Sequence, residues 1–251
     1  MAEQPGTTST ASTATRNHVH AITRVYGRAE PTGVMGSVTM AHRIRVIVAL
    51  ATALALGCPP PLTGASPAAT VTAVSEADLG ATWRPECPVR PAHLRRVEVS
   101  YTGFDGQLRR GALVVHRNVV EDVIAIFDEL QKLHYPIQRM QTVDRYQGAD
   151  DELSMEDNNT SAFNCRRLPG SAEWSPHAFG RAIDVNPLIN PYLDAGGDLQ
   201  PVTAARYLDR GRDDAGILRA DSPAVRAFTD RGWRWGGGWR NPVDYQHFEV
   251  G

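Results

Sequence analysis

Core-forming sequence is confined to the later part of this chain, and this most constrains what it can fold into. Residues 1–34 are rich in Thr, Ser, Ala and Gly and carry little apolar periodicity. Such a segment cannot bury enough surface to offset the entropy lost on ordering. Strand-like and helical apolar patterns run instead from about residue 84 to residue 251. We therefore expect one folded domain over residues 84–251, long enough to build a single hydrophobic core.

The segment before this domain has the pattern of an export signal. A basic stretch precedes the eleven-residue apolar run Val46 to Leu56, which is typical of a secretory signal peptide. We expect residues 1–58 to hold a disordered extension and this signal, with translation starting at Met35 or Met40. A buried core helix is the alternative, and the long polar leader disfavours it.

Two processing sites are open after the apolar run. Gly57-Cys58 resembles a bacterial lipoprotein cleavage site, although Ala55 stands where Leu is usual. Ordinary cleavage near residues 65–68 is the alternative. Residues 59–83 then form a Pro/Ala/Thr/Ser linker. We expect an exported protein of the cell envelope or exterior, with a lipid on Cys58 as its one route to a membrane.

Composition and cysteine content exclude several classes of protein. The formal net charge of −2 offers no basic excess for binding nucleic acid. No apolar run approaches the roughly 20 residues of a membrane-spanning helix. Cys87 and Cys165 follow the leader, and two such cysteines in an exported chain most often pair. We predict a disulfide between them, with two buried free thiols as the alternative, and we expect a monomer.

Local patterns predict a mixture of strands and helices. Residues 97–102 alternate between apolar and polar, which predicts a strand, and Asp105-Gly106 predicts a hairpin turn. Apolar residues at helical spacing predict a helix over 119–133, capped by Asn118. The other expected elements are a return strand at 113–115, a short strand at 136–140, a long acidic loop at 144–162, a helix from Ser222-Pro223 to Gly232, and a Trp/Gly-rich cleft wall or core-pinned turn at 233–239.

Two short segments carry the residues suited to chemistry. Ser175–Asp184 contains His177 and Asp184, and Asp244–Glu249 contains His247. Two imidazoles and one carboxylate match the three protein ligands of a catalytic zinc, which keeps one position open for water. We interpret the remaining candidates, His93, His116 and His134, as ordinary surface or core histidines.

Asp244 adds a carboxylate three residues before His247. A carboxylate close to a metal ligand, yet not needed for coordination, suits the general base that takes a proton from metal-activated water. The alternative is that each of these side chains is an ordinary surface or core residue.

The pattern Ser-x-His-x-x-Gly-x-Ala-x-Asp, followed by Asp-x-x-His-Phe, is similar to the motifs of the zinc D-alanyl-D-alanine carboxypeptidase family. Its members include D-Ala-D-Ala dipeptidases and phage L-alanyl-D-glutamate endopeptidases. The likeness covers residues 84–251, most clearly 161–251. It implies an α+β fold, with a small antiparallel sheet carrying the site and helices packed on one side. It also implies that His177, Asp184 and His247 hold Zn²⁺.

The resemblance implies roles for further residues. Asp244 takes the general-base position, where many members have the longer Glu. Ser175 matches a position that helps orient the substrate. An upstream Arg holds the scissile carbonyl or a terminal carboxylate, and Arg166 is the first candidate, with Arg139 and Arg145 as others. A guanidinium suits a carboxylate because it donates two parallel hydrogen bonds.

These features together imply a zinc metallopeptidase that hydrolyses peptidoglycan stem peptides, of the D,D-carboxypeptidase type. Which peptide bond is cut stays open, because carboxypeptidase, dipeptidase and endopeptidase members share the same ligands. The alternative is a non-catalytic, zinc-containing cell-wall-binding module, and Asp244 favours the enzyme because zinc storage does not need it. A third interpretation is a cysteine hydrolase built on Cys165, but nothing in the sequence marks that thiol as activated.

Overall fold

Residues 68–251 are described by the computed structural model. The predicted export signal, Cys58 and the first part of the predicted linker lie outside these residues. The helices and strands are β1 (Thr70–Ala73), α1 (Glu76–Leu79), β2 (Leu94–Thr102), β3 (Leu108–His116), α2 (Val120–Lys132), β4 (Arg139–Met140), α3 (Asp151–Glu156), β5 (Asn159–Thr160), β6 (Ala182–Asp184), β7 (Tyr192–Leu193), β8 (Leu199–Gln200), α4 (Pro223–Thr229), β9 (Arg234–Trp235), β10 (Val243–Asp244) and β11 (His247–Glu249).

Short 3₁₀ turns join these elements. They are η1 (Gly80–Thr82), η2 (Pro91–His93), η3 (Arg117–Val119), η4 (Val143–Arg145), η5 (Gln147–Ala149), η6 (Pro176–Phe179), η7 (Val202–Leu208) and η8 (Gly236–Gly238). Within residues 68–251, no helix has the length and apolar character needed to cross a bilayer.

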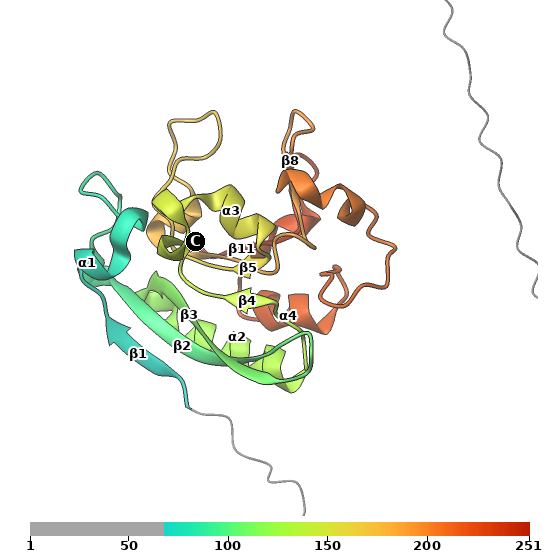
Figure 1. Ribbon diagram of the computed structural model, residues 1–251, viewed down its shortest axis with the longest axis horizontal. Helices are drawn as coiled ribbons and strands as arrows, with labels where there is room; N and C mark the ends of the chain where they lie inside the picture. Colours follow the sequence, from blue (N-terminus) through green and yellow to red (C-terminus); the bar gives the residue numbers. More distant parts are fainter. Residues whose placement is uncertain (1–67) are drawn as a thin grey trace, which may run out of the picture. The chain divides into compact units, whose positions relative to one another are not determined.

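The predicted hairpin is confirmed and forms the long antiparallel pair of β2 and β3, with Val97 opposite Leu113. Both side chains are buried on the face that α2 covers, because the alternation directs every second residue toward the helix. Helix α2 presents Val123 and Phe127 to this core, as its apolar spacing predicts (Figure 1).

The predicted start of the domain at residue 84 is too late. Strand β1 pairs with β2, with Thr70 opposite Glu98, and Ser75 caps α1. All four residues of β1 are exposed. An edge strand held by backbone hydrogen bonds needs no apolar pattern, so the residues from 70 onward resembled a linker in the sequence.

A second small sheet has the strand order β6-β11-β9, and all its pairs are antiparallel. Phe248 in the middle of β11 is fully buried and stacks on Phe228 of α4 at 3.8 Å between ring centroids. Its neighbours His247 and Glu249 point to the opposite face, because side chains alternate along a strand. The α+β prediction is confirmed by this mixture of small antiparallel sheets and helices.

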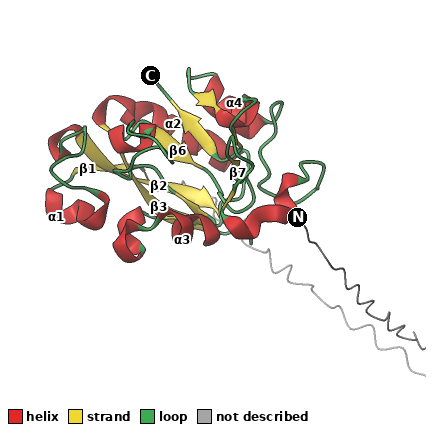
Figure 2. Ribbon diagram, turned by 90° about the horizontal axis from the view of Figure 1, so that it is seen from above, coloured by secondary structure: helices red, strands yellow, loops and turns green. Residues whose placement is uncertain are grey.

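The expectation that helices pack on one side holds for α2 and α4, which share one core with Phe248. Helix α3 lies on the opposite side of the molecule from these two helices in both views (Figures 1 and 2). It occupies part of the predicted acidic loop at 144–162, so that prediction is wrong over this range. Asp150 caps α3, and the helix buries only Ser154 and Met155. Two adjacent buried residues do not produce a helical period in the sequence.

Two other local predictions need correction, and one is confirmed. Asn118 does not cap α2; instead its backbone N–H donates to Nδ1 of His116, at 3.3 Å. Of residues 136–140, only Arg139–Met140 form a strand, parallel to β5. The helix at Ser222-Pro223 is confirmed, with Ser222 as its cap.

The predicted disulfide between Cys87 and Cys165 is confirmed, with 5.9 Å between the two Cα atoms. The bond joins the segment before β2 to the segment that leads into η6.

Candidate metal centre

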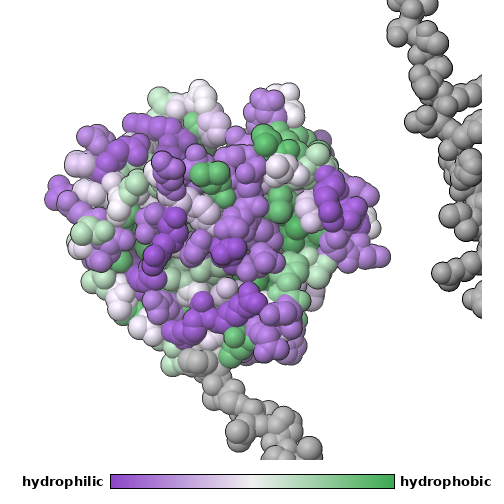
Figure 3. Space-filling model, in the orientation of Figure 1, coloured by the Kyte–Doolittle hydropathy of each residue, from purple (hydrophilic) through white to green (hydrophobic). Residues whose placement is uncertain are grey.

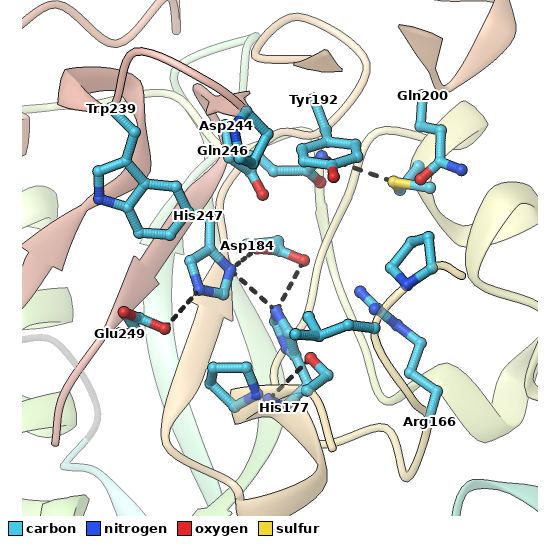
Figure 4. Close-up of a pocket in the computed structure, with 16 residues that line it drawn as sticks. Arg166, His177, Asp184, Tyr192, Gln200, Trp239, Asp244, Gln246, His247 and Glu249 are labelled. Carbon is cyan, nitrogen blue, oxygen red and sulfur yellow. Dashed lines mark hydrogen bonds and ion pairs between the residues drawn. The ribbon is translucent and has the colours of Figure 1, made fainter. Parts of the chain in front are cut away.

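Three buried side chains converge beside β11 (Figure 4). Nε2 of His177 lies 3.1 Å from Nδ1 of His247 and 3.1 Å from Oδ2 of Asp184. Nδ1 of His247 lies 3.0 Å from Oδ1 of Asp184. Ligand atoms around a tetrahedral zinc, with bonds of about 2.0–2.1 Å, lie about 3.3 Å apart. The donor set and its spacing therefore fit a zinc ion.

The positions of two of these ligands follow from strand register. Asp184 of β6 and His247 of β11 lie directly opposite each other in the antiparallel pair. Residues paired in this way project from the same face with Cβ atoms about 4.5–5.5 Å apart. The sheet itself therefore sets the separation of the carboxylate and the imidazole.

The third ligand is placed by the turn η6. Oγ of Ser175 accepts a hydrogen bond from the backbone N–H of His177 and so caps this turn. Gly180 then ends the turn with a φ of +67°, a conformation that favours glycine. A Cβ at this position would lie 2.6 Å from the backbone nitrogen of His116. The sharp return of the chain into β6 thus requires glycine.

Hydrogen bonds orient both imidazoles. Nδ1–H of His177 donates to the backbone carbonyl of Ala162 at 2.5 Å, which leaves Nε2 to face the other ligands. Nε2–H of His247 donates to Oε2 of Glu249 at 3.3 Å, which leaves Nδ1 to face them. Arg234 forms an ion pair with the other oxygen of Glu249. Metal-ligating histidines commonly have such a carboxylate or carbonyl partner.

Glu249 was not among the residues that the motifs predicted. The signal that could have found it is the strand period, because residues two apart on β11 share a face.

The electrostatics of the cluster favour a positive charge at its centre. Burial alone would lower the pKa of His247, but hydrogen bonds to Asp184 and Glu249 raise it to about 10. Burial alone would raise the pKa of Asp184, but the interactions with His177 and His247 hold it well below its usual range. A divalent cation between these groups would satisfy the same negative potential.

The ligands open into a cavity of about 230 Å³. Two projecting loops form its walls: residues 165–174, and the β7–β8 hairpin (Figures 1 and 3). In the space-filling view these loops stand apart with a hollow between them (Figure 3). The lining residues are Met155, Arg166, Leu168, Pro169, Ser175, Pro176, His177, Asp184, Tyr192, Gln200, Trp239, Pro242, Asp244, Gln246, His247 and Glu249.

Asp244 lies in this cavity beside the ligands, as the sequence predicted. Burial raises its pKa to about 7. Its Oδ1 atom is shielded from solvent and makes no hydrogen bond within residues 68–251, and the same holds for Oε1 of Gln246. A buried oxygen without a partner is costly unless another group binds it. These two atoms are therefore the acceptors that a bound molecule would meet.

Both interpretations of the Trp/Gly segment 233–239 hold, at different residues. Trp233 is buried and contacts Phe228 edge-to-face, so it belongs to the core. Trp239 lines the cavity. A Cβ on Gly236 would lie 2.7 Å from the backbone oxygen of Asp244, so this glycine allows η8 to approach the strand that carries Asp244.

Of the predicted arginines, the structure brings only Arg166 to the cavity. Its Nε atom lies 2.7 Å from Oδ2 of Asp151 in α3. Burial alone would lower the pKa of Arg166, but the carboxylates of Asp151, Asp184 and Asp244 raise it. Arg166 is therefore held as a cation that faces the other charged groups of the site.

Arg139 and Arg145 lie elsewhere, so the prediction that Arg139 binds substrate is not supported. Arg139 is exposed and forms an ion pair with Asp157 at 2.8 Å. Arg145 is exposed near β2 and β3. Ser175 does line the cavity, although its hydroxyl is engaged with the backbone of His177.

Comparison with known proteins identifies one family. Residues 169–250 match the model of a peptidase family described as D-alanyl-D-alanine carboxypeptidase. This segment contains Ser175, His177, Asp184, Asp244 and His247, and the match confirms the resemblance drawn from the motifs. Neither a curated protein nor a solved structure matches the chain.

Proposed function

We propose that this protein, whose residues 169–250 match the D-alanyl-D-alanine carboxypeptidase family, is a zinc metallopeptidase that hydrolyses peptidoglycan stem peptides. The observation that carries the proposal is the buried His177–Asp184–His247 cluster with the unpartnered oxygen of Asp244 in the same cavity. A zinc-storage or structural site would not need that additional carboxylate. Within this proposal, the D,D-carboxypeptidase type is the specific activity we favour.

Three side chains would hold the ion. His177 would bind it through Nε2, His247 through Nδ1, and Asp184 through one carboxylate oxygen. When bound, zinc supplies a Lewis acid that polarises the scissile carbonyl and makes water more acidic.

The remaining steps belong to groups of the chain. Oδ1 of Asp244 accepts a proton from the attacking water and then passes it to the leaving amine. The Arg166 guanidinium stabilises the oxygen on which negative charge develops, or holds a terminal carboxylate. Ser175 acts through His177, because its hydroxyl fixes the turn that carries this ligand.

The proposed substrate lies outside the cytoplasm, and we propose that the protein is exported to the cell envelope or beyond. The Cys87–Cys165 disulfide supports this, because such bonds persist in oxidising compartments. A lipid anchor on Cys58, a monomeric state and processing of the leader are parts of the same proposal.

Mass analysis of muropeptides after incubation with the zinc-loaded protein tests this function. Loss of one D-Ala, release of a dipeptide and cleavage of a crosslink each change the mass differently, so the result also identifies the bond. The Asp244→Ala variant is the control and should leave the muropeptides intact. Cleavage by this variant at the wild-type rate would refute the mechanism, and binding without cleavage by the wild type would favour a wall-binding module.

A further inference from the structure

We propose that a second pocket, on the side of the metal ligands away from Arg166, binds a free carboxylate of the substrate through Arg181. This inference rests on the proposed peptidase function and names the chemical class of its substrate. The substrate is a peptide with acidic groups on both sides of the amide bond that is cut.

The second pocket, which we call the basic pocket, has a volume of about 440 Å³. Its walls include Trp174, Phe179, Arg181, Arg234 and the last residue, Gly251, which forms no ion pair with either arginine, and the pocket shares Pro176 and Glu249 with the metal cavity. Figure 4 shows Glu249 and Arg166 on opposite sides of the three ligand side chains. A peptide that passes the metal centre away from Arg166 therefore approaches the basic pocket.

One segment of chain serves both cavities. Between Ser175 and Asp184, the motif positions His177 and Asp184 face the metal cavity, whereas Phe179 and Arg181 face the basic pocket. Phe179 and Arg181 occupy positions that the motif leaves unspecified. Metal binding and recognition of the substrate are thus assigned to different residues of the same short segment.

The Arg181 guanidinium is available for a ligand. Within residues 68–251 it makes no ion pair and no side-chain hydrogen bond, whereas Arg234 is already paired with Glu249. Burial first, and then the charge of Arg181, lower the pKa of His116 in the same pocket. A half-buried cation without a carboxylate partner is a suitable site for an anionic group.

The surroundings favour a carboxylate on a peptide over a free inorganic anion. Phe179 is 38% exposed in this pocket, whereas the Trp174 ring already contacts the Arg167 guanidinium, 3.6 Å from the ring centroid. The Phe179 ring can cover the aliphatic part of a side chain whose carboxylate reaches Arg181. Planar guanidinium groups bind carboxylates with two parallel hydrogen bonds, so an amide in the same place would be bound less tightly.

Calorimetric titration of three synthetic stem peptides into the zinc-loaded Asp244→Asn variant tests the proposal, since this variant should not consume them. One peptide has free carboxylates on both sides of the scissile amide, and each of the others has one of these carboxylates converted to an amide. Arg181→Gln is added to this background, with Arg181→Lys to retain the charge. Arg145→Ala is the matched control, because Arg145 is also exposed and without an ion pair within residues 68–251.

We expect Arg181→Gln to weaken binding of the double acid by about tenfold or more. One of the two amidated peptides lacks the carboxylate that faces Arg181. Arg181→Gln should leave the affinity for that peptide unchanged. Arg181→Lys should recover part of the loss, and Arg145→Ala should change nothing. Equal losses for all three peptides, or no loss for the double acid, would overturn the proposal.

The proposed function has a separate readout, which is cleavage of muropeptides by the wild type. Binding that depends on Arg181 without cleavage would refute the peptidase and leave the carboxylate site standing. Cleavage that is unchanged by Arg181→Gln and by amidation of the substrate would support the peptidase and refute the carboxylate site.

Discussion

Replacing Gly180 by alanine should destabilise the protein more than the same change at Gly170, although both glycines have a φ of +67°. An L-residue in this conformation costs about 1–2 kcal/mol, which applies to both sites. At Gly170 a new Cβ meets nothing within 4 Å, whereas at Gly180 it lies 2.6 Å from the backbone nitrogen of His116. Relieving such an overlap costs about a further 1–3 kcal/mol.

The expected losses are therefore about 1–2 kcal/mol for Gly170→Ala and about 2–5 kcal/mol for Gly180→Ala. For a domain of this size, each kcal/mol lowers Tm by about 2–4 °C. Thermal and urea unfolding of the metal-free proteins measures both values. The overlap also opposes the hydrogen bond of 2.8 Å from His116 N–H to the Gly180 carbonyl, in the turn that places His177. Zinc affinity should therefore fall in Gly180→Ala and stay unchanged in Gly170→Ala. Equal stabilities for the two variants would refute the reasoning.

Three further predictions concern the metal centre. Asp244→Asn should lower kcat by about 100- to 10,000-fold while zinc affinity is retained. In the wild type, burial raises the pKa of Asp244 to about 7. Because the base must be ionised, kcat/KM should fall as the pH drops through this value. Zinc at 1,000 times its Kd should stabilise the protein by about 4 kcal/mol, and chelation should reverse this in thermal unfolding. The affinity for zinc should rise with pH below about 10, since zinc must displace the proton of His247. Glu249→Ala should weaken zinc binding by about 10- to 100-fold in a chelator competition assay, whereas the exposed Glu86→Ala should leave it unchanged, and identical affinities would contradict a role for Glu249 in orienting His247.

The parts of the fold that were predictable are those with a strong local pattern. Strand β2 and helix α2 each follow one period over many residues: Val97, Val99 and Tyr101 of β2 and Val123, Phe127 and Leu130 of α2 are buried in one core. Strand β1 and helix α3 lacked such a signal, since β1 is wholly exposed and α3 spans only six residues. Neighbours distant in sequence decide the structure of such segments.

The same distinction applies to the site. His177, Asp184, His247 and Asp244 could be found because they recur at fixed spacing in two short motifs. The motifs did not distinguish among the arginines, because the role depends on which loop reaches the cavity. The pair of Asp151 and Arg166 joins α3 to a separate loop, and this contact is a product of tertiary packing.

The direct pairing of Asp184 with His247 has a consequence for how this site can vary. Two neighbouring rungs of a β-ladder keep their spacing whatever the length of chain that connects them. Sixty-two residues separate these ligands, and the β7–β8 hairpin among them can therefore lengthen, shorten or change composition without moving the two donors apart. Architecture of this kind lets the preference for a substrate diverge rapidly while the position of the ion is inherited unchanged.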